Sequence, residues 1–460
     1  MDKFSMQGSV PQPMNGAEFK EKRIAAEKIV SRLAERGHTA LFAGGYVRDK
    51  LLGHAGSADI DIATSATPDE VMALFSSTIP VGAKFGVVIV VYSGIPFEVA
   101  TFRADLGIGD GRHPESIAFA DAREDALRRD FTINGMFYDP LTDRVIDYVS
   151  GEADLRLKIV RAIGDPKLRF REDYLRLLRA IRFAARFDFS IDSATLEAVI
   201  ADAPGIAGVS AERIFSELDR MLRQPHPDRA FRLLLESGLL HHTLPEVDDL
   251  VGVEQPPEFH PEGDVFEHTI KALGLLDRAD APAPSAILAW SVLLHDIGKK
   301  ATMRRLDRIR FNNHDQVGAD LSGLVLRRLR APNELIDGVA ACIGNHMNFM
   351  NVTAMRLSTL KKLLSRPTIA DELELHRIDC LASHGNIDNF YFVKDRLAAF
   401  AQEVIKPAPL LRGADLLGLG YRPGPKMGEI LREVYDLQLD ETIRTRDEAV
   451  EYVKSRWPIE

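Results

Sequence analysis

The sequence has few cysteines and no long apolar run, and we expect no secretory signal in it. Its two cysteines, Cys342 and Cys380, lie in segments with helical patterns, which argues against a disulfide framework or a thiolate zinc site. No segment approaches the roughly 18 apolar residues of a membrane span, so we expect no membrane role. The N-terminus carries one early lysine and no apolar stretch. We therefore expect a disordered leader over residues 1–18 and a cytoplasmic protein.

The chain also lacks an excess of positive charge. Its formal net charge of −10 argues, taken alone, against a nucleic-acid partner, because phosphate binding relies on Lys and Arg. Arginine is nevertheless clustered in residues 123–129, 169–186 and 304–310, so local basic surfaces can exist on an acidic total. Solvated helix faces are the alternative explanation of each cluster.

The length and the apolar content are sufficient for several cores. The chain has 460 residues, of which 45% are hydrophobic and 27% charged, as in globular proteins of two to four domains. Short apolar runs predict strands at Leu41–Ala43, Val87–Tyr92 and Phe97–Phe102, and helical spacing dominates beyond Asp165. We predict an α+β fold with a mixed-sheet head over 19–165, followed by an all-α neck over 166–254, a metal-binding helical domain over 255–402 and a helical tail over 403–460.

Two glycines follow the first predicted strand. Gly44 and Gly45 precede a helix-like segment at Lys50 to Leu52, so the backbone can approach a phosphate closely there. Arg48 can then bind a triphosphate. An ordinary tight turn is the alternative for this segment.

A pair of carboxylates follows. Asp59 and Asp61 stand at i and i+2 on a predicted strand, so both project from the same face. Divalent ions such as Mg²⁺ relieve the repulsion between them, and a metal pair can activate a 3′-hydroxyl and stabilise leaving pyrophosphate. Glu98 is a candidate third carboxylate from a neighbouring strand. Solvent-facing acidic residues are the alternative for all three.

These motifs resemble the polymerase-beta-like nucleotidyltransferases, specifically the bacterial class II CCA-adding enzymes and poly(A) polymerases. Residues 127–134 resemble the family's Arg-Arg-Asp motif, which implies contacts to the incoming nucleotide by Arg128, Arg129, Asp130 and Asn134. Residues 171–176 resemble its Glu-Asp-x-x-Arg motif, which implies that Glu172, Asp173 and Arg176, with Arg179 nearby, act as a protein template for C and A.

The spacing of the second motif suits that role. On one helix Asp173 and Glu172 would lie three and four residues from Arg176, so these side chains could hold one another in position. A carboxylate accepts from an exocyclic amine and a guanidinium donates to ring nitrogen and carbonyl oxygen. The alternative is an ordinary ion-pair network with Arg179 and Arg182.

Two further segments resemble parts of the same family. Arg103 to Pro114 is similar to its flexible loop, which implies movement as specificity switches from C to A. Ser210 to Ile214 resembles a neck motif, in which Glu212 and Arg213 are expected to brace the helix with the template residues.

A second constellation lies in the predicted metal-binding domain. Histidines and aspartates recur in an apolar helical context, and neutral imidazole with carboxylate suits Mn²⁺, Ni²⁺, Fe²⁺ or Zn²⁺. Their order resembles the HD phosphohydrolase superfamily. This implies metal ligation by His268, His295, Asp296 and Asp379, with His314 and His346 as second-metal ligands, and phosphatase or 2′,3′-cyclic phosphodiesterase activity. A structural or tRNA-docking metal domain is the alternative.

The sequence thus predicts an enzyme that adds CCA to the 3′ end of tRNA from CTP and ATP, with Mg²⁺ at Asp59 and Asp61. A poly(A) polymerase or an A-adding enzyme is the alternative within the class, and the intact loop at 103–114 argues against a CC-only enzyme. Alternatives from other classes are a metal phosphohydrolase with a nucleotide-binding module and a non-catalytic RNA-binding module. The oligomeric state stays open.

Overall fold

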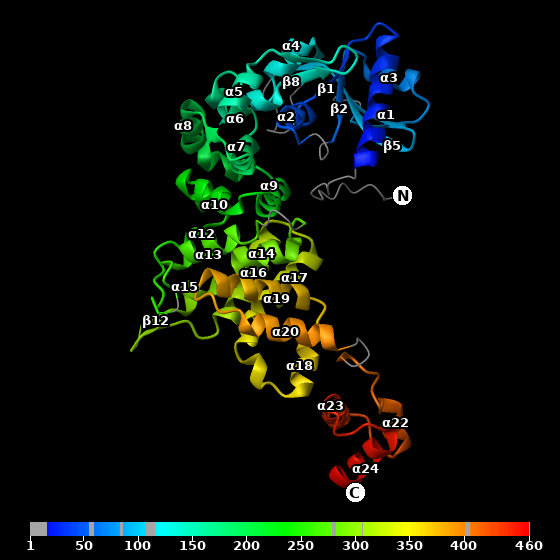
Figure 1. The fold of residues 1–460 in the computed structure, drawn as a ribbon, viewed down its shortest axis with the longest axis vertical. Helices are drawn as coiled ribbons and strands as arrows, with labels where there is room; N and C mark the ends of the chain where they lie inside the picture. Colours follow the sequence, from blue (N-terminus) through cyan, green and yellow to red (C-terminus); the bar gives the residue numbers. More distant parts are fainter. Residues whose placement is uncertain are drawn as a thin grey trace. The chain divides into compact units, whose positions relative to one another are not determined.

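The computed structural model describes residues 16–54, 59–82, 86–106, 116–258, 260–277, 282–305, 307–400 and 405–459. The chain forms two compact units (Figure 1). The first comprises Met1–Asp248, Leu276–Ala283 and Arg328–Ala331, and the second comprises Asp249–Leu275, Pro284–Arg327 and Pro332–Glu460. The finer domain boundaries near residues 165 and 402 stay predictions. Among the described residues, no helix has both the length and the apolar character needed to cross a bilayer.

The first unit begins with a mixed sheet and its helices, which confirms the predicted α+β class. The sheet has seven strands in the order β3-β4-β5-β2-β1-β8-β9. Its strands are β1 (Ala40–Ala43), β2 (Asp61–Thr64), β3 (Thr78–Gly82), β4 (Val87–Tyr92), β5 (Ile95–Thr101), β8 (Met136–Asp139) and β9 (Arg144–Asp147). A separate ribbon pairs β6 (Arg103–Leu106) with β7 (Ser116–Phe119). The helices are α1 (Gly16–Ala34), α2 (Gly45–Leu51), α3 (Pro68–Leu74) and α4 (Ala122–Leu127), with η3 (Thr132–Asn134) before β8.

All three predicted strands are present, as β1, β4 and β5. β4 is a continuous apolar run. It lies between β3 and β5, and β5 lies between β4 and β2, so each has a hydrogen-bonded neighbour strand on both sides. β2 pairs parallel with β5 and antiparallel with β1, and this places it inside the sheet. Helix α1 begins at Gly16, two residues before the predicted end of the leader, and residues 1–15 lie outside the described part.

Helices continue the first unit beyond the sheet. They are α5 (Gly151–Leu157), α6 (Pro166–Glu172), α7 (Leu175–Arg186), α8 (Ser193–Asp202), η4 (Ala203–Gly208), α9 (Ala211–Arg223), α10 (Pro227–Glu236), α11 (Leu239–Thr243) and α12 (Pro245–Asp248). A short parallel ribbon, β10 (Ile159–Val160) with β11 (Ser190–Ile191), was not predicted. α7 packs against both α9 and α10. α9 ends at Arg223 and α10 begins at Pro227, because Pro225 and Pro227 cannot donate a backbone hydrogen bond within a continuous helix.

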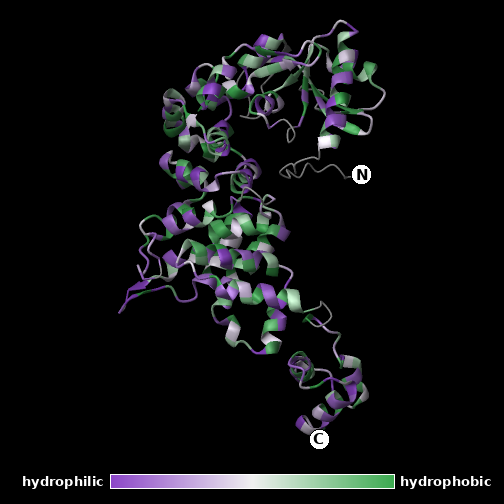
Figure 2. Ribbon diagram, in the orientation of Figure 1, coloured by the Kyte–Doolittle hydropathy of each residue, from purple (hydrophilic) through white to green (hydrophobic). Residues whose placement is uncertain are grey.

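The second unit is almost entirely helical. It contains α13 (Val265–Gly274), α14 (Ala286–Leu294), α15 (Gly298–Thr302), α16 (His314–Arg328), α17 (Asn333–Asn345), η5 (His346–Ala354), α18 (Leu357–Leu364), α19 (Ile369–Ala382) and α20 (Asp388–Ala399). A hairpin, β12 (Arg304–Arg305) with β13 (Ile309–Arg310), interrupts it and was not predicted. α14 is buried along most of its length and is largely green in Figure 2. Cys342 and Cys380 are free and buried in α17 and α19, as predicted.

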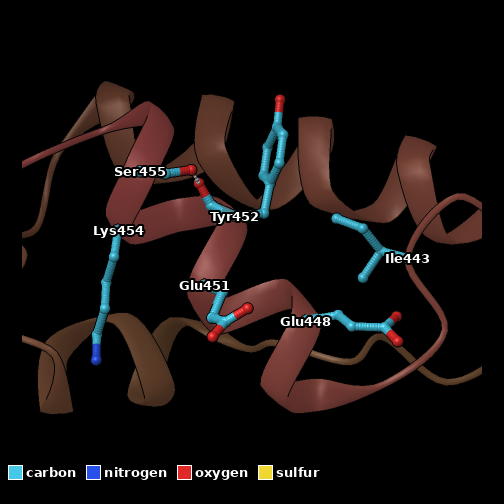
Figure 3. A pocket seen from close by; sticks show the side chains of 6 residues that line it. All are labelled: Ile443, Glu448, Glu451, Tyr452, Lys454 and Ser455. Carbon is cyan, nitrogen blue, oxygen red and sulfur yellow. Dashed lines mark hydrogen bonds between the residues drawn. The ribbon is translucent and has the colours of Figure 1, made fainter.

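The C-terminal helices have a small core of their own. α22 (Gly413–Gly418), α23 (Pro425–Leu439) and α24 (Arg446–Arg456) enclose Leu416, Ile430 and Val453. A pocket on α24 is lined by Ile443, Glu448, Glu451, Tyr452, Lys454 and Ser455 (Figure 3). Because Tyr452 and Lys454 leave the helix in opposite directions, these side chains do not converge on one point, and the pocket is a poor candidate for a site.

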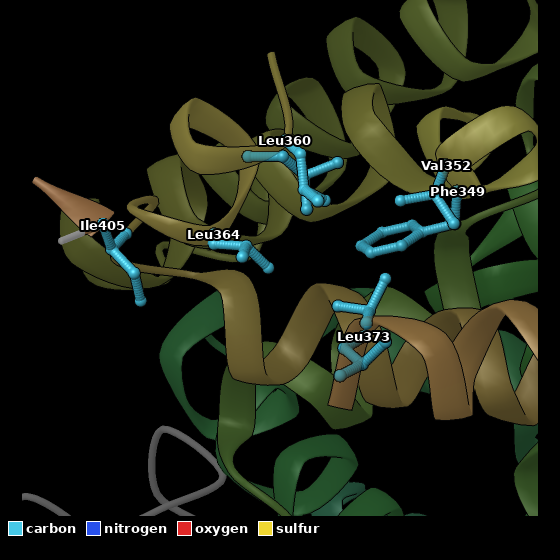
Figure 4. Packing of buried hydrophobic residues seen from close by; sticks show 8 residues of the cluster. Phe349, Val352, Leu360, Leu364, Leu373 and Ile405 are labelled. Atoms are coloured by element: carbon cyan, nitrogen blue, oxygen red, sulfur yellow. The ribbon is translucent and has the colours of Figure 1, made fainter. Parts of the chain in front are cut away.

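A second apolar cluster supports α18, the helix on which α23 packs. Phe349, Val352, Leu360, Leu364 and Leu373 meet there, and Ile405 lies at its edge (Figure 4). The buried Lys361 amine of α18 donates to the carbonyl of Leu439 at 3.0 Å and contacts Glu441 at 3.0 Å. The tail helices are therefore joined to α18 by polar contacts as well as by packing.

Candidate active site and metal centre

All but one of the predicted nucleotide-binding residues line one cleft of the first unit. Its volume is about 540 Å³, and its lining includes residues of strands β2 and β5 and of helices α7 and α9. From the predicted set the cleft gathers Gly44, Gly45, Arg48, Asp61, Glu98, Arg128, Arg129, Asp130, Asn134, Asp173, Arg176 and Arg179. Its lining also includes Arg103, Phe183 and Arg213, which were not predicted as binding residues. Asp59 and Glu172 are absent from it.

Asp61 and Glu98 lie side by side at the acidic end of the cleft. The parallel register pairs Ile62 with Val99, so the preceding residues, Asp61 and Glu98, are neighbours on the same face of the sheet. The prediction that Asp59 shares the strand with Asp61 is wrong. β2 begins at Asp61, opposite the last residue of β1, Ala43, so β1 ends before it could pair with Asp59.

Asp59 remains close to the other two carboxylates. Its side chain is 72% exposed and accepts from the Lys22 amine at 2.7 Å, and with Asp61 and Glu98 it lines a small adjoining pocket. Burial raises the pKa of Asp61 to about 6, and the nearby charges of Glu98 and Asp59 contribute, although the side chain still faces the open cleft. Carboxylates so close carry excess negative charge, and a divalent cation with oxygen ligands would relieve it.

Gly44 and Arg48 form the wall beside these carboxylates. Gly44 has φ 62°, and a Cβ there would lie 3.0 Å from the Arg129 guanidinium, so the position favours glycine. Helix α2 starts directly at Gly45, earlier than expected. The Arg48 guanidinium is buried, binds Asp49 at 2.7 Å and Asn134 at 2.5 Å, and stacks over Phe187 at 4.6 Å. Those contacts indicate that Arg48 stabilises the wall of the cleft beside the carboxylates.

One buried carboxylate orients both arginines of the Arg-Arg-Asp motif. Asp125 Oδ1 accepts from Arg128 Nε at 2.9 Å, and Asp125 Oδ2 accepts from Arg129 Nε at 3.1 Å and Nη2 at 3.0 Å. Burial would raise the pKa of Asp125, but Arg129 and Arg128 outweigh it and lower the pKa. Asp125 was not predicted, although its spacing of three and four residues from the arginines was a usable signal.

Asp130 is held from three sides. Its Oδ2 accepts from Arg179 Nε at 2.7 Å, and its Oδ1 accepts from the backbone of Phe131 at 2.8 Å and from Asn134 Nδ2 at 3.1 Å. Burial would raise its pKa, but these partners, Arg179 foremost, lower it to about 2. The predicted residues Asp130, Asn134 and Arg179 therefore form one charged network beneath the cleft.

The Glu-Asp-x-x-Arg motif does not lie on one helix, contrary to the prediction. α6 ends at Glu172, Asp173 is extended with φ −158°, and α7 begins at Leu175. Arg176 still binds Glu172 at 2.5 Å across the break. Asp173 accepts from the Leu175 backbone at 3.1 Å and from two nitrogens of Arg213.

The two neck residues behave differently. Arg213 braces Asp173 as expected and also lines the cleft, whereas Glu212 contacts Arg330 at 3.5 Å and lies outside it. Of the predicted flexible loop, residues 107–114 lie outside the described part of the chain.

All six predicted metal ligands of the second unit meet in one buried cluster. His268 Nε2 lies 3.2 Å from His295 Nε2 and 3.1 Å from Asp379 Oδ1. The Nε2 atoms of His314 and His346 are 3.2 Å apart. Asp296 lies between these groups, with Oδ2 3.3 Å from His295 and Oδ1 3.6 Å from His314. Four imidazoles and two carboxylates therefore form two adjoining groups of ligands that share Asp296.

Backbone carbonyls fix the histidine tautomers. The Nδ1 atoms of His295, His314 and His346 donate to the carbonyls of Val292, Phe311 and Ile343. A neutral imidazole that donates through Nδ1 presents a lone pair at Nε2, so His314 and His346 direct two lone pairs at each other. Burial and the neighbouring imidazoles lower the pKa of His346 to about 4, which keeps it in the neutral form that binds metals. The donor set fits a transition-metal ion.

Sequence reasoning missed a second layer around this cluster. Glu262 Oε1 accepts from His268 Nδ1 at 2.6 Å and contacts His260 Nδ1 at 2.9 Å. Lys299 lies 2.8 Å from Asp296 and donates to Gln255 at 2.6 Å. Burial alone would lower the pKa of His268, but Asp379 and Glu262 raise it to about 9, which shows the strength of the negative field there.

Two family models match the first unit. Residues 40–161 match the poly A polymerase head domain, and residues 188–251 match the segment described as probable RNA and SrmB-binding site of polymerase A. The lining of the cleft described above lies in these two matched segments and in the stretch between them, residues 162–187. The matched segments end at residue 251, so the family models do not cover the metal cluster of the second unit, and its assignment depends on its geometry.

The curated relatives are more specific. The chain is 45% identical over 212 residues to the CCA-adding enzyme of Geobacillus thermodenitrificans, covering 46% of this chain and 52% of that protein. It is 39% identical over 218 residues to the CCA-adding enzyme of Limosilactobacillus reuteri, covering 47% and 54%. The alignments therefore span about half the length of these relatives.

Solved structures extend the likeness over nearly the whole chain. The CCA-adding enzyme of Bacillus stearothermophilus in complex with CTP superposes with a TM-score of 0.72 at 26% identity, covering 95% of this chain and 98% of that one. The Thermotoga maritima CCA-adding enzyme complexed with tRNA superposes with a TM-score of 0.58 at 20% identity, covering 96% of both. At that identity the second match shows the fold alone.

Proposed function

We propose that the chain is a CCA-adding enzyme, which extends the 3′ end of tRNA from CTP and ATP without a template strand. The observation that carries the proposal is the cleft itself. Its lining brings Asp61 and Glu98 together with Asp173 and Arg176 and with Arg128 and Arg129. The 45% identity to a CCA-adding enzyme over 212 residues supports the substrate pair.

Asp59 and Asp61 are the proposed magnesium ligands, and Glu98 is a further candidate. Bound Mg²⁺ would lower the pKa of the attacking 3′-hydroxyl and neutralise charge on the departing pyrophosphate. The chain's own groups bind and orient the reactants. Arg128 and Arg129, which Asp125 holds at fixed angles, bind the triphosphate oxygens, so the α-phosphorus is held in line with the 3′-oxygen.

Base selection is assigned to Asp173 and Arg176. An exocyclic amine, which C and A both carry, donates to the Asp173 carboxylate, while Arg176 donates to a ring nitrogen or carbonyl oxygen. U and G present a carbonyl where C and A present the amine, so the acceptor would exclude them. Asp130 remains the proposed acceptor for the ribose hydroxyl.

A single assay tests this function. A tRNA that ends in its discriminator base is incubated with CTP and ATP, and its 3′ ends are sequenced. We expect CCA ends from the wild type, none from Asp61→Ala, and unchanged tRNA binding by that variant. A-only or poly(A) ends would support the alternatives within the class, and retained CCA addition by Asp61→Ala would overturn the site.

We also propose that the second unit is a metal-dependent phosphohydrolase that acts on terminal or 2′,3′-cyclic phosphates. The specific observation is the pair of facing Nε2 atoms at 3.2 Å in each half of the cluster. The proposed ligands are His268, His295, Asp296, His314, His346 and Asp379, and Mn²⁺, Ni²⁺, Fe²⁺ or Zn²⁺ suits them. His295→Ala should abolish hydrolysis of a cyclic phosphate and leave CCA addition intact, whereas Asp61→Ala should do the reverse.

A further inference from the structure

A basic β-hairpin adjoins the metal cluster, and neither reaction proposed above assigns it a role. Its strands place Arg304 opposite Arg310 and Arg305 opposite Ile309. The stretch 299–310 carries six basic side chains against one acidic residue, Asp307: they are Lys299, Lys300, Arg304, Arg305, Arg308 and Arg310. We call residues 304, 305 and 307–310 the basic hairpin. In a chain with a net charge of −10, this is a marked local excess of positive charge.

Both ends of the hairpin are anchored at the cluster. Before it, Lys299 contacts Asp296 at 2.8 Å, and after it the Phe311 carbonyl accepts from His314 Nδ1. The Lys299 amine lies 5.5 Å from the Phe311 ring, so the two ends meet. Gly298 brings the backbones together, since a Cβ there would lie 2.1 Å from the His314 carbonyl oxygen. The base of the hairpin therefore lies at Asp296 and His314.

Most of the basic groups have acidic partners within the unit. Lys300 contacts Asp249 at 2.7 Å, Arg305 contacts Glu254 at 3.1 Å, and Arg310 contacts Asp307 at 2.9 Å. Arg304 and Arg308 are exposed, and neither has an ion pair within the described part of the second unit. The surplus charge is thus concentrated in two accessible guanidinium groups, which bind phosphate oxygens in two-point contacts.

We propose that Arg304 and Arg308 of the basic hairpin bind the phosphate backbone of an RNA strand whose 3′ end enters the metal cluster. The proposal rests on the phosphohydrolase function proposed for that cluster and names its substrate as an RNA end instead of a free nucleotide. A polyanion is the partner because the exposed groups are guanidinium side chains, and the strand reaches the cluster along the hairpin. An acidic protein segment offers the same charge with a different geometry, and the experiment separates the two.

The first measurement compares two substrates of the full-length protein loaded with Mn²⁺. One is an RNA oligonucleotide that ends in a 2′,3′-cyclic phosphate, and the other is a 2′,3′-cyclic mononucleotide. Arg304→Ser/Arg308→Ser should raise KM for the oligonucleotide and leave kcat and the mononucleotide kinetics unchanged. The salt dependence of kcat/KM should also weaken, by about sevenfold between about 50 and about 200 mM salt for two lost single-strand phosphate contacts.

The matched control, Arg327→Ser/Arg396→Ser, removes two exposed arginines elsewhere in the unit and changes the net charge by the same amount. Equal shifts of KM in both variants would show a non-specific charge effect and overturn the proposal, as would an unchanged KM in the hairpin variant. Competition by polyglutamate as strong as that by RNA of equal charge would also overturn it, in favour of an acidic protein partner.

A cross-linking measurement decides the proposal independently of hydrolysis. Both native cysteines are buried, so a thiol introduced by Asp307→Cys on the hairpin, or by Asp395→Cys on α20 as control, can carry a photoreactive group selectively. RNA should cross-link to the hairpin site, and the Arg304→Ser/Arg308→Ser changes should remove that product. If neither substrate is hydrolysed by the wild type, the phosphohydrolase proposal fails alone. Equal cross-linking at both positions would overturn RNA binding by the hairpin.

Discussion

Arg213 holds Asp173 by two hydrogen bonds, from Nη1 to Oδ1 at 3.2 Å and from Nη2 to Oδ2 at 2.7 Å. The arginine comes from α9 and the aspartate from the break between α6 and α7, so the tertiary fold makes this contact. A paired contact of this kind fixes the plane of the carboxylate. Asp173 therefore presents its remaining lone pairs in one direction, which discrimination between bases requires.

Replacing Arg213 with lysine keeps the charge and removes the two-point geometry. We expect Arg213→Lys to lower the ratio of kcat/KM for CTP to that for UTP about tenfold, because a lost charge-assisted hydrogen bond costs about 1.5 kcal/mol. Single-nucleotide incorporation into tRNA measures the ratio. Arg220→Lys, also on α9, is the control. Unchanged discrimination in Arg213→Lys would show that the orientation of Asp173 does not select the base.

Asp125 is the residue that should matter most without touching a nucleotide. Asp125→Asn removes the charge that aligns Arg128 and Arg129, and we expect KM for both CTP and ATP to rise about tenfold or more, since breaking a buried ion pair costs a few kcal/mol. Steady-state kinetics with each nucleotide tests this. Glu124→Gln, on the same helix but exposed, should behave as wild type. An effect on one nucleotide alone would contradict a role at the shared triphosphate.

Local patterns predicted three strands of the sheet and the helical character of the chain beyond Asp165. Strands β1, β4 and β5 were visible as short apolar runs, and the residues of the Arg-Arg-Asp motif were contiguous. The spacing of Asp125 from Arg128 and Arg129 was also local. It was overlooked because acidic and basic residues at that spacing are common on solvated helices.

The errors have non-local causes. The helix expected through residues 172–176 breaks at Asp173, where the carboxylate binds Arg213, 40 residues away. The adjacency of Asp61 and Glu98 depends on parallel pairing of β2 with β5, which no local pattern specifies. Glu262 lies six residues before His268, outside any helical spacing, and their contact depends on how the chain turns into α13.

The Asp130 network predicts a pH dependence of stability in the first unit. Its folded pKa of about 2 lies below the model-peptide value of 3.8, so its ionised form stabilises the fold by about 2 kcal/mol. A lowered carboxylate pKa means that this contribution is complete above about pH 4 and is lost as pH falls towards 2. Asp130→Asn should therefore be less stable than wild type at pH 6, and the difference should shrink below pH 4.

The measurement must report on the first unit, because both tryptophans, Trp290 and Trp457, belong to the second. Urea-dependent hydrogen exchange in peptides covering η3 and α7 meets this need. Asp139→Asn, on the partly buried end of β8, is a control without an arginine partner of this kind. If the difference in stability between wild type and Asp130→Asn stays constant from pH 6 to pH 3, ionisation of Asp130 does not stabilise the fold.

Glu262 offers the sharpest test of the metal centre because it acts through His268 without joining the ligands. A carboxylate on Nδ1 makes the imidazole a better donor at Nε2, and loss of such a partner weakens metal binding by about 10-fold to 100-fold. We expect Glu262→Gln, which keeps the shape and removes the charge, to weaken Mn²⁺ binding by about that factor. Calorimetric titration in an Asp61→Ala background measures this without a contribution from the proposed magnesium site. Glu258→Gln, exposed and four residues earlier, is the control.

Hydrolysis by Glu262→Gln should recover at high Mn²⁺, because the change alters the orientation and basicity of the His268 imidazole and leaves the set of metal ligands intact. Wild-type affinity with a lower kcat that excess metal does not restore would instead place Glu262 in direct contact with the substrate.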